Sequence, residues 1–262
     1  MVERPQLTAR YFDTWYADMA RSSAKDDIAA RHLGLPPDLL STNTVPWQGV
    51  GDIVAALGLR AGDTLLDLAC GRAGYGMEIA ARTSAALIGV DFSGEAVRQA
   101  GEQSRRRGRG DTFIVGDLSA TPLAAGTVQA AVCLDSIQFA APSGAAYREL
   151  ARVLAPGGRT VLTCWEPVEP GDGRLTERLR WVDLAAGLAA AGFCDVVATP
   201  RPDWRDQERS FWQEAASLDP GDDPPLRSLR DEGVRSLATF DLLTRVMACA
   251  TAPTGTGQVR RR

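Results

Sequence analysis

Short apolar segments alternate with helical segments from Thr64 onward, and this alternation constrains the fold more than any other feature of the sequence. Apolar runs of this length predict strands, and the longer segments between them have helical periodicity. Strands that alternate with helices form a parallel sheet through right-handed crossovers, with helices on both faces. The predicted strands are TLLDLA (64–69), AALIGVD (85–91), DTFIVGD (111–117), QAAVCLD (129–135), RTVLTCW (159–165), CDVVATP (194–200) and VMACATAP (246–253). We therefore expect an α/β fold of the Rossmann-like type.

The segments outside this alternation predict helical additions to one domain. Residues 1–50 precede the sheet and are expected to form an N-terminal helical cap, while 51–253 form the sheet domain. A polar, Pro-rich stretch at 203–245 predicts a helical insertion before the last strand, and 254–262 is expected to be a flexible tail. A chain of 262 residues with 45% hydrophobic residues can bury the core of such a domain.

Composition narrows the class of partner. The formal net charge of −4 argues against a nucleic-acid or anionic-membrane surface and favours a small-molecule substrate. The basic run RRRGR (105–109) is expected to be a solvated loop. The five cysteines show neither zinc nor disulfide spacing, which predicts no metal site and a reducing, cytoplasmic location. We find no apolar signal core at the N-terminus and no run that would span a bilayer.

Aspartates mark the C-terminal ends of four predicted strands, at Asp67, Asp91, Asp117 and Asp135. Ligands of open doubly wound sheets bind at this edge, although a single strand-end Asp can also cap the next helix. Asp67 precedes a turn of small residues, where it would repel a pyrophosphate but suit a ligand with an ammonium group. Asp91 can accept both hydroxyls of a ribose, and Asp117 can accept from an exocyclic adenine amine. Together these acids describe a nucleoside that carries an amine and lacks phosphate.

The motifs LLDLACGRAGYG, LIGVDFS, FIVGDLS, AAVCLDSIQFA and LARVLAPGGRTVLTCWEP occur in the order and spacing of a known family. The chain resembles the class I S-adenosylmethionine-dependent methyltransferases, most of all the small-molecule enzymes of bacterial specialised metabolism. The resemblance covers residues 50–200. It implies a seven-stranded, mostly parallel sheet with an antiparallel last strand, and S-adenosyl-L-methionine as the cofactor. Ala69 and Ala73 depart from the glycine pattern G-x-G-x-G of the family.

The resemblance also implies which part of the cofactor each motif would hold. The first motif would hold the methionine portion, and the second the ribose and one adenine face. The third motif would hold the adenine, and the fourth would line the methyl-donating side. In that order the implied residues are Asp67, Ala69, Cys70 and Gly71, then Asp91 and Phe92, then Asp117 and Leu118, and finally Asp135, Ser136 and Ile137.

Residues outside the motifs complete the predicted site. Tyr16 in the cap can face a cation, or it can pack in the core. Trp47 is assigned to the methionine end from its position alone. His32, the only histidine, and Glu166 are the candidate bases, although an amine acceptor can lose its proton to water.

The expected function is transfer of a methyl group from S-adenosylmethionine to a small organic molecule, in natural-product biosynthesis such as that of antibiotics. The cofactor supplies the electrophilic methyl, and the protein aligns the acceptor. Aromatic residues in the last third of the chain are expected to roof the pocket, which predicts a fairly apolar substrate. They are Trp165, Trp204, Phe211 and Trp212.

Two alternatives and several details stay open. A cyclase or another non-methylating enzyme that binds S-adenosylmethionine would have the same motifs, because fold does not fix function. An NAD(P)-dependent oxidoreductase is disfavoured by Asp67 before the glycine turn and by the lack of a Tyr-x-x-x-Lys pair. The accepting atom, and the choice between monomer and homodimer, do not follow from the sequence.

Overall fold

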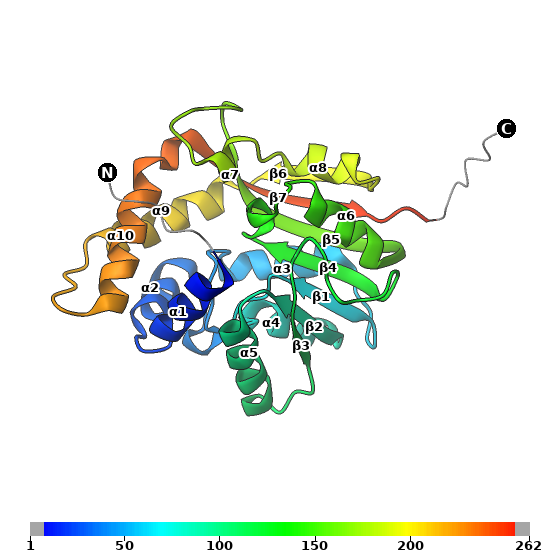
Figure 1. Cartoon of the computed structure of the whole chain (residues 1–262), viewed down its shortest axis with the longest axis horizontal. Coiled ribbons are helices and arrows are strands. Elements are labelled where there is room, and N and C mark those ends of the chain that lie inside the picture. The colour runs from blue at the N-terminus through cyan, green and yellow to red at the C-terminus, as the bar shows by residue number, and fades with distance from the viewer. Residues whose placement is uncertain (1–7, 255–262) are drawn as a thin grey trace.

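A mixed sheet of seven strands dominates the computed structural model, which describes residues 8–254 (Figure 1). The strand order is β3-β2-β1-β4-β5-β7-β6, and β7 runs antiparallel to both β5 and β6 while the other neighbours are parallel. The predicted fold class, including the antiparallel last strand, is confirmed. The strands are β1 (Thr64–Leu68), β2 (Ala86–Asp91), β3 (Thr112–Val115), β4 (Val128–Leu134), β5 (Leu154–Pro167), β6 (Cys194–Pro200) and β7 (Leu243–Thr251).

Helices cover both faces of the sheet. Three short 3-10 turns accompany them: η1 (Pro37–Leu39), η2 (Ile137–Phe139) and η3 (Phe240–Leu242). The α-helices are α1 (Ala9–Met19), α2 (Ala24–Leu33), α3 (Trp47–Leu57), α4 (Gly74–Thr83), α5 (Gly94–Arg106), α6 (Ala145–Val153), α7 (Glu177–Arg180), α8 (Leu184–Ala190), α9 (Pro202–Ala216) and α10 (Pro224–Ala238). Among these described helices, none combines the length and the apolar character that crossing a bilayer requires.

The central strands are apolar on both faces because both faces are covered. Neighbouring side chains along a strand point to opposite sides of the sheet. Accordingly Leu65 belongs to the hydrophobic cluster on one face and Leu66 to the cluster on the other. In β4, Val132 and Cys133 divide between the two clusters in the same way. This double burial explains why the predicted strands read as continuous apolar runs.

Some element boundaries differ from the sequence-based expectation. Strand β5 already begins at Leu154, where it pairs with Val128, and an irregularity in register separates this pair from the next one. Helix α8 begins at Leu184 because the side chain of Asp183 accepts the N–H of Ala186 and caps the helix there. The basic run 105–109 is not a free loop, since its first two arginines close α5.

The N-terminal helices and the insertion share one core. Helix α9 packs against both α2 and α10, and Figure 1 shows α1, α2, α9 and α10 together beside the sheet. Trp204 and Phe211 of α9 are fully buried in the same hydrophobic cluster as Ile28 of α2. The division into cap, sheet domain and insertion remains a prediction, and residue 50 lies inside α3. The predicted tail, 254–262, lies outside the described residues apart from Thr254.

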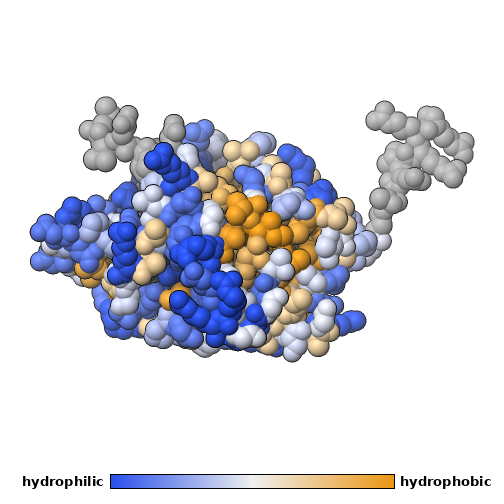
Figure 2. Space-filling view, turned by 60° about the horizontal axis from the view of Figure 1, so that its bottom comes forward, coloured by the Kyte–Doolittle hydropathy of each residue, from blue (hydrophilic) through white to orange (hydrophobic). Residues whose placement is uncertain are grey.

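The connection from β3 to β4 contains turns but no helix. An isolated bridge between Asp117 and Ala120 closes its first turn. Val115, at the end of the edge strand β3, is 55% exposed. Figure 2 brings the lower side of Figure 1 forward and shows one area of apolar side chains on that face of the molecule, between hydrophilic areas.

Candidate active site

The strand-end acids lie at the carboxyl edge of the sheet, below the N-terminal helices. Asp67 is the penultimate residue of β1 and Asp91 is the last residue of β2. Both carboxyl groups are buried, with 4% of each residue exposed. Asp135 follows β4 directly. The parallel order β2-β1-β4 therefore brings three of the four predicted acids to adjacent strand ends.

The turn after β1 needs small residues because its backbone is unusual and its surroundings are crowded. Ala69, Gly71 and Ala73 all have left-handed backbone, with φ of 60°, 53° and 58°. For a non-glycine residue this conformation costs about 1–2 kcal/mol, and such strain gathers at functional sites. A Cβ atom on Gly74 would overlap the carbonyl oxygen of Leu39. The two alanines thus keep the backbone shape of the family's glycines at an energetic cost.

Asp91 connects this turn to the start of α5 through hydrogen bonds. Its carboxylate accepts the N–H of Gly71 at 2.8 Å and that of Ser93 at 2.9 Å. Burial raises the pKa of Asp91, while these backbone hydrogen bonds favour its charged form. The Ser93 hydroxyl in turn donates to Asp13 of α1 at 2.6 Å. Helix α1 is therefore tied directly to the Asp91 corner of the site.

Asp67 is the least compensated acid of the site. Burial, followed by the nearby Asp91, raises its pKa to about 7, and a backbone hydrogen bond from Gly76 offsets only part of this effect. Burial likewise raises the pKa of the neighbouring Cys70 thiol. A buried carboxyl beside a second acid is stabilised by a cationic ligand, because the positive charge favours its ionised form. This environment agrees with the ammonium group inferred from the sequence.

Aromatic side chains of α1 lie over the turn and the Asp91 corner. Tyr16 is 6% exposed, and its hydroxyl would be 2.8 Å from a Cβ added to Gly71. Burial raises the Tyr16 pKa, and a hydrogen bond joins its hydroxyl to Thr42. Phe12, one helical turn before Tyr16, packs against Phe92 with 5.2 Å between ring centroids. The sequence analysis missed Phe12, although its spacing of four from Tyr16 marks a shared helix face.

Asp135 is the centre of a second, buried polar cluster. It has a left-handed backbone with φ 56°, and its carboxylate accepts the Thr163 hydroxyl at 2.7 Å. Arg245 of β7, which is 0% exposed, contacts both carboxylate oxygens at 2.7 Å. Glu208 of α9 lies 3.6 Å from Arg245 and is 2% exposed. The sequence analysis missed Arg245 and Glu208; the only signal was a charged residue inside the apolar strand LTRVMACAT.

The remaining residues predicted around the cofactor are less enclosed or belong to the core. Asp117 is exposed, and its carboxylate accepts the Ser119 N–H at 2.7 Å. Leu118 packs against the hydrophobic cluster that contains Ile137, which is 2% exposed. The Ser136 hydroxyl donates to the carbonyl oxygen of Leu134. Their roles toward a cofactor remain predictions.

His32, Trp47 and Glu166 have partners outside the acid cluster. His32 Nε2 lies 2.5 Å from Glu214 of α9, and Trp47 stacks below the guanidinium of Arg82 at 4.4 Å. His32 and Trp47 share the lining of a hollow of about 260 Å³. Glu166 accepts the N–H of Leu184 at the start of α8, and burial raises its pKa. These contacts give each residue a structural role, while the roles assigned from the sequence remain predictions.

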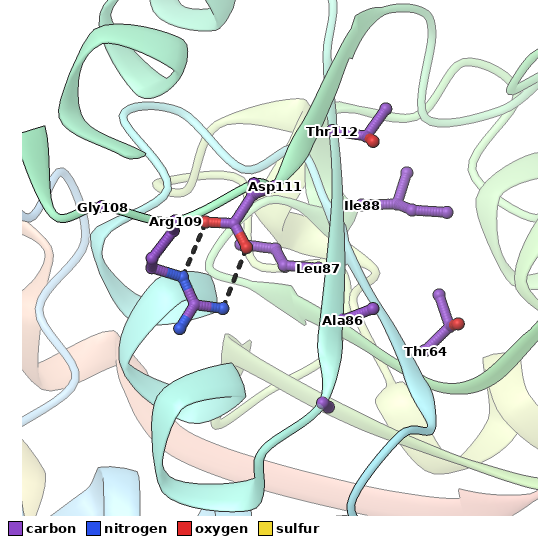
Figure 3. Close-up of a pocket in the computed structure, with 10 residues that line it drawn as sticks. Thr64, Ala86, Leu87, Ile88, Gly108, Arg109, Asp111 and Thr112 are labelled. Carbon is purple, nitrogen blue, oxygen red and sulfur yellow. Dashed lines mark hydrogen bonds and ion pairs between the residues drawn. The ribbon is translucent and has the colours of Figure 1, made fainter. Parts of the chain in front are cut away.

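A larger hollow lies at the opposite edge of the sheet (Figure 3). It has a volume of about 560 Å³ and is lined by the first residues of β1, β2 and β3. Arg109, from the basic run, lies here in a two-pronged ion pair with Asp111, at 2.7 and 2.9 Å. The charges of Arg109 and Asp111 neutralise each other, so neither side chain in this hollow carries an unpaired charge. Within 8–254, no group of three or more His, Cys, Asp or Glu side chains is arranged to hold a metal ion.

The fold is Rossmann-like, and acids lie at the carboxyl ends of three adjacent strands. Residues 65–158, which include the glycine turn and the ends of β1 to β4, match the family described as Methyltransferase domain. The chain is 31% identical over 150 residues to the demethylmenaquinone methyltransferase of Beutenbergia cavernae, covering 55% of this chain and 59% of that protein. It spans 27% to 59% of the length of three curated relatives that it matches.

Solved structures share the fold at low sequence identity. A crystal structure of the 4+2 cyclase SpnF covers 79% of this chain and 81% of its own, with a TM-score of 0.67 and 22% identity. Phosphoethanolamine N-methyltransferase 2 of Haemonchus contortus, solved with S-adenosylhomocysteine, covers 88% of this chain and 58% of its own, with a TM-score of 0.70 and 16% identity. Over residues 65–158 the chain is thus similar to methyltransferase domains, and its fold is that of solved methyltransferases.

Proposed function

We propose that the protein transfers a methyl group from S-adenosyl-L-methionine to a small organic molecule. The observation that carries this proposal is the pair Asp67 and Asp91, buried side by side at the carboxyl edge of the sheet under α1. Methyltransferases among the relatives support the reaction type, and the neighbour solved with S-adenosylhomocysteine supports the cofactor. A place in bacterial specialised metabolism, a cytoplasmic location and a fairly apolar substrate are parts of the same proposal.

The chemistry of the donor set fits this cofactor. Asp67 is an uncompensated buried acid that an ammonium group would stabilise. Asp91 offers carboxylate oxygens suited to ribose hydroxyls, and Gly71 lets Tyr16 and Thr42 pack closely on the turn, because a Cβ there would clash with both. Asp117 and Leu118 would hold the adenine. The absence of a lysine other than Lys25 and the acid before the turn both fit a ligand without phosphate.

The residues of the chain would act mainly by orientation and by exclusion of water. When bound, the cofactor supplies an electrophilic sulfonium methyl. Asp67 and Asp91 would fix its two ends, and the aromatic face of Phe12 and Tyr16 would exclude water above it. Asp135 and Ile137, at the end of β4, would border the acceptor. When two reactants are held in alignment in this way, a large part of the free-energy barrier to methyl transfer is removed.

Calorimetric titration with S-adenosylmethionine, S-adenosylhomocysteine and NADH tests the cofactor first. We expect both adenosyl ligands to bind and NADH to give no heat. Asp91→Ala should weaken adenosyl binding, whereas Asp206→Ala, an exposed site on α9, is the matched control. Binding of NADH alone would refute the proposal.

Radiolabelled methyl transfer to a metabolite extract then tests the reaction. Label in a small molecule, together with formation of S-adenosylhomocysteine, is the expected result. Cofactor binding without any consumption of S-adenosylmethionine would favour the alternative of a cyclase or another non-methylating enzyme, for which the likeness to the cyclase SpnF is evidence of fold alone.

A further inference from the structure

Glu208 occupies a buried position next to the end of β4. Its Oε1 atom accepts two indole N–H groups, from Trp165 at 3.2 Å and from Trp212 at 3.0 Å. These bonds hold the carboxyl in one orientation. The other oxygen, Oε2, has no donor in good hydrogen-bonding geometry among the described residues, although the Thr44 hydroxyl and Arg245 Nε lie close to this carboxyl. Buried carboxylate oxygens are normally satisfied, so an oriented and unsatisfied one calls for an explanation.

The neighbouring arginine does not satisfy Oε2. Both Nη atoms of Arg245 lie on Asp135, and its Nε is 3.6 Å from Glu208 Oε2, which is too long for a hydrogen bond. Arg245 Nε has no hydrogen-bond partner within 8–254 either. Arg245 is therefore bound mainly by Asp135 and shares only a longer ion pair with Glu208. An anionic ligand is disfavoured here, because Asp135 already neutralises the guanidinium.

The position of the cluster links it to the proposed reaction. Asp135 borders the methyl-donating side in the proposed function, it has a left-handed backbone, and its carboxylate contacts Arg245. The N–H of Thr44, in the segment between α2 and α3, also reaches Asp135, at 3.3 Å. Glu208 thus lies where the N-terminal segment, the insertion and the ends of β4, β5 and β7 meet. Beyond β4 the sheet continues with β5 and β7.

We propose that Glu208 is the general base of the methyl transfer. The acceptor is then a small alcohol, phenol or amine, whose nucleophilic atom carries a proton. This inference rests on the proposed function. The indoles of Trp165 and Trp212 act as positioning groups that leave Oε2 free to receive the proton. Because Glu208 is 2% exposed in this closed form, the proposal includes an open form that admits the acceptor and whose closure excludes water from the step.

The step balances without any further reactant. The acceptor heteroatom forms a bond to the methyl carbon, and the pair of the broken C–S bond returns to sulfur. The proton of the heteroatom passes to Oε2 of Glu208, which releases it to water on opening. An oriented base held by a third group is the arrangement that nucleophile activation requires.

The electrostatic surroundings agree with this role. Burial raises the pKa of Glu208 to about 7, and Arg245 opposes the rise while Asp135 adds to it. Lys25 of α2 and Tyr75 of α4 are the other ionisable groups that interact with this carboxyl. The Thr44 hydroxyl also favours its ionised form. A base is most effective when its pKa lies near the working pH.

Kinetics of Glu208→Gln test the role, with phenol, benzyl alcohol, benzylamine and N-methylbenzylamine as acceptors. The amide keeps an oxygen for the two indoles but takes no proton. We expect kcat to fall about 100-fold to 10,000-fold while S-adenosylmethionine affinity stays unchanged by calorimetry. In the wild type, kcat/KM should rise about tenfold per pH unit below about 7 and level off above it. This limb should be absent in Glu208→Gln and retained in Glu208→Asp.

Asp206→Asn is the matched control, because it makes the same chemical change on the exposed side of α9. It should keep the wild-type kcat and the acidic limb. A Glu208→Gln variant with wild-type kcat and pH profile would overturn the inference, as would wild-type protein that binds the cofactor but methylates none of the four acceptors. Loss of cofactor binding in the wild type would instead overturn the proposed function.

A second measurement uses the wild type alone and needs no turnover. Protonation of Glu208 weakens it as an acceptor, so the indole N–H resonances of Trp165 and Trp212 should shift with pH with a midpoint of about 7. Trp165→Phe and Trp212→Phe assign the two resonances among the six tryptophans. Resonances that stay constant from pH 5.5 to 8.5 would show that the carboxyl does not change its protonation there, and would refute the role of base.

Discussion

Replacement of Asp67 by Asn is expected to stabilise the protein at pH 8 while it weakens binding of S-adenosylmethionine. Burial raises the Asp67 pKa from its usual 3.8 to about 7. Between these two values the folded protein holds a proton that the unfolded chain has lost. The free energy of unfolding therefore falls as the pH rises through this interval and reaches its low plateau above pH 7. Asparagine does not ionise, so the free energy of unfolding of Asp67→Asn does not fall in this way.

The magnitude follows from the two pKa values. Each pH unit between them is worth about 1.4 kcal/mol, so the full interval corresponds to about 4 kcal/mol in favour of Asp67→Asn at pH 8. Near pH 4 the two proteins should differ little, because Asp67 is then protonated in the folded protein as well. Asparagine keeps an oxygen that can accept the backbone hydrogen bond from Gly76.

Urea unfolding followed by tryptophan fluorescence measures this difference, at pH 8 and again near pH 4. Asp206→Asn controls for the loss of a carboxylate as such, and should unfold like the wild type at both pH values. Calorimetry on the same samples should show weaker cofactor binding for Asp67→Asn. A variant that is equally or less stable than the wild type at pH 8 would contradict the burial argument. Unchanged affinity would contradict the contact with the ammonium group.

Four further substitutions test the site and the core. Asp91→Ala should weaken adenosyl binding by about 1–3 kcal/mol in calorimetry, the cost of unpaired polar groups, and equal affinity would rule out the ribose contact. Gly74→Ala should lower stability by about 1–3 kcal/mol in urea, because its methyl group would overlap the Leu39 carbonyl, and it should speed hydrogen exchange in η1. Trp204→Ala, at a fully buried position, should lower the free energy of unfolding by about 3–5 kcal/mol. Trp181→Ala, at a residue that is 69% exposed, should lower it by less than about 0.5 kcal/mol. Similar losses of stability in the two variants would contradict the assignment of the core.

The sheet could be predicted from the sequence because its signals are local. Each strand is a short apolar run, and double burial makes these runs conspicuous. Element ends were harder to predict, since hydrogen bonds with other segments decide them. Strand β5 extends back to Leu154 because that residue pairs with Val128, and Asp183 delays α8 by capping it. The partner of Leu154 lies outside the segment that it extends, whereas the Asp183 cap is local to α8.

The two clusters of charged residues in the site also differ in how far the sequence predicts them. Asp67 and Asp91 could be found because each ends an apolar run, and parallel strands bring such ends to one edge. Arg245 and Glu208 could not, because a charged residue in a strand or helix usually faces water. Arg245 lies 110 residues from its partner Asp135, and Glu208 lies 43 residues from Trp165.

The sequence by itself determined the order of strands and helices, the small-residue turn after β1 and the acids at the strand ends, because these depend on neighbours along the chain. Only the tertiary structure decided that β7 inserts between β5 and β6 and that α9 folds back onto α2. These contacts surround Glu208 with buried groups, and burial raises its pKa to about 7. The charge state of a carboxyl depends on the solvent and charges around it in space, which the order of residues in the chain does not specify.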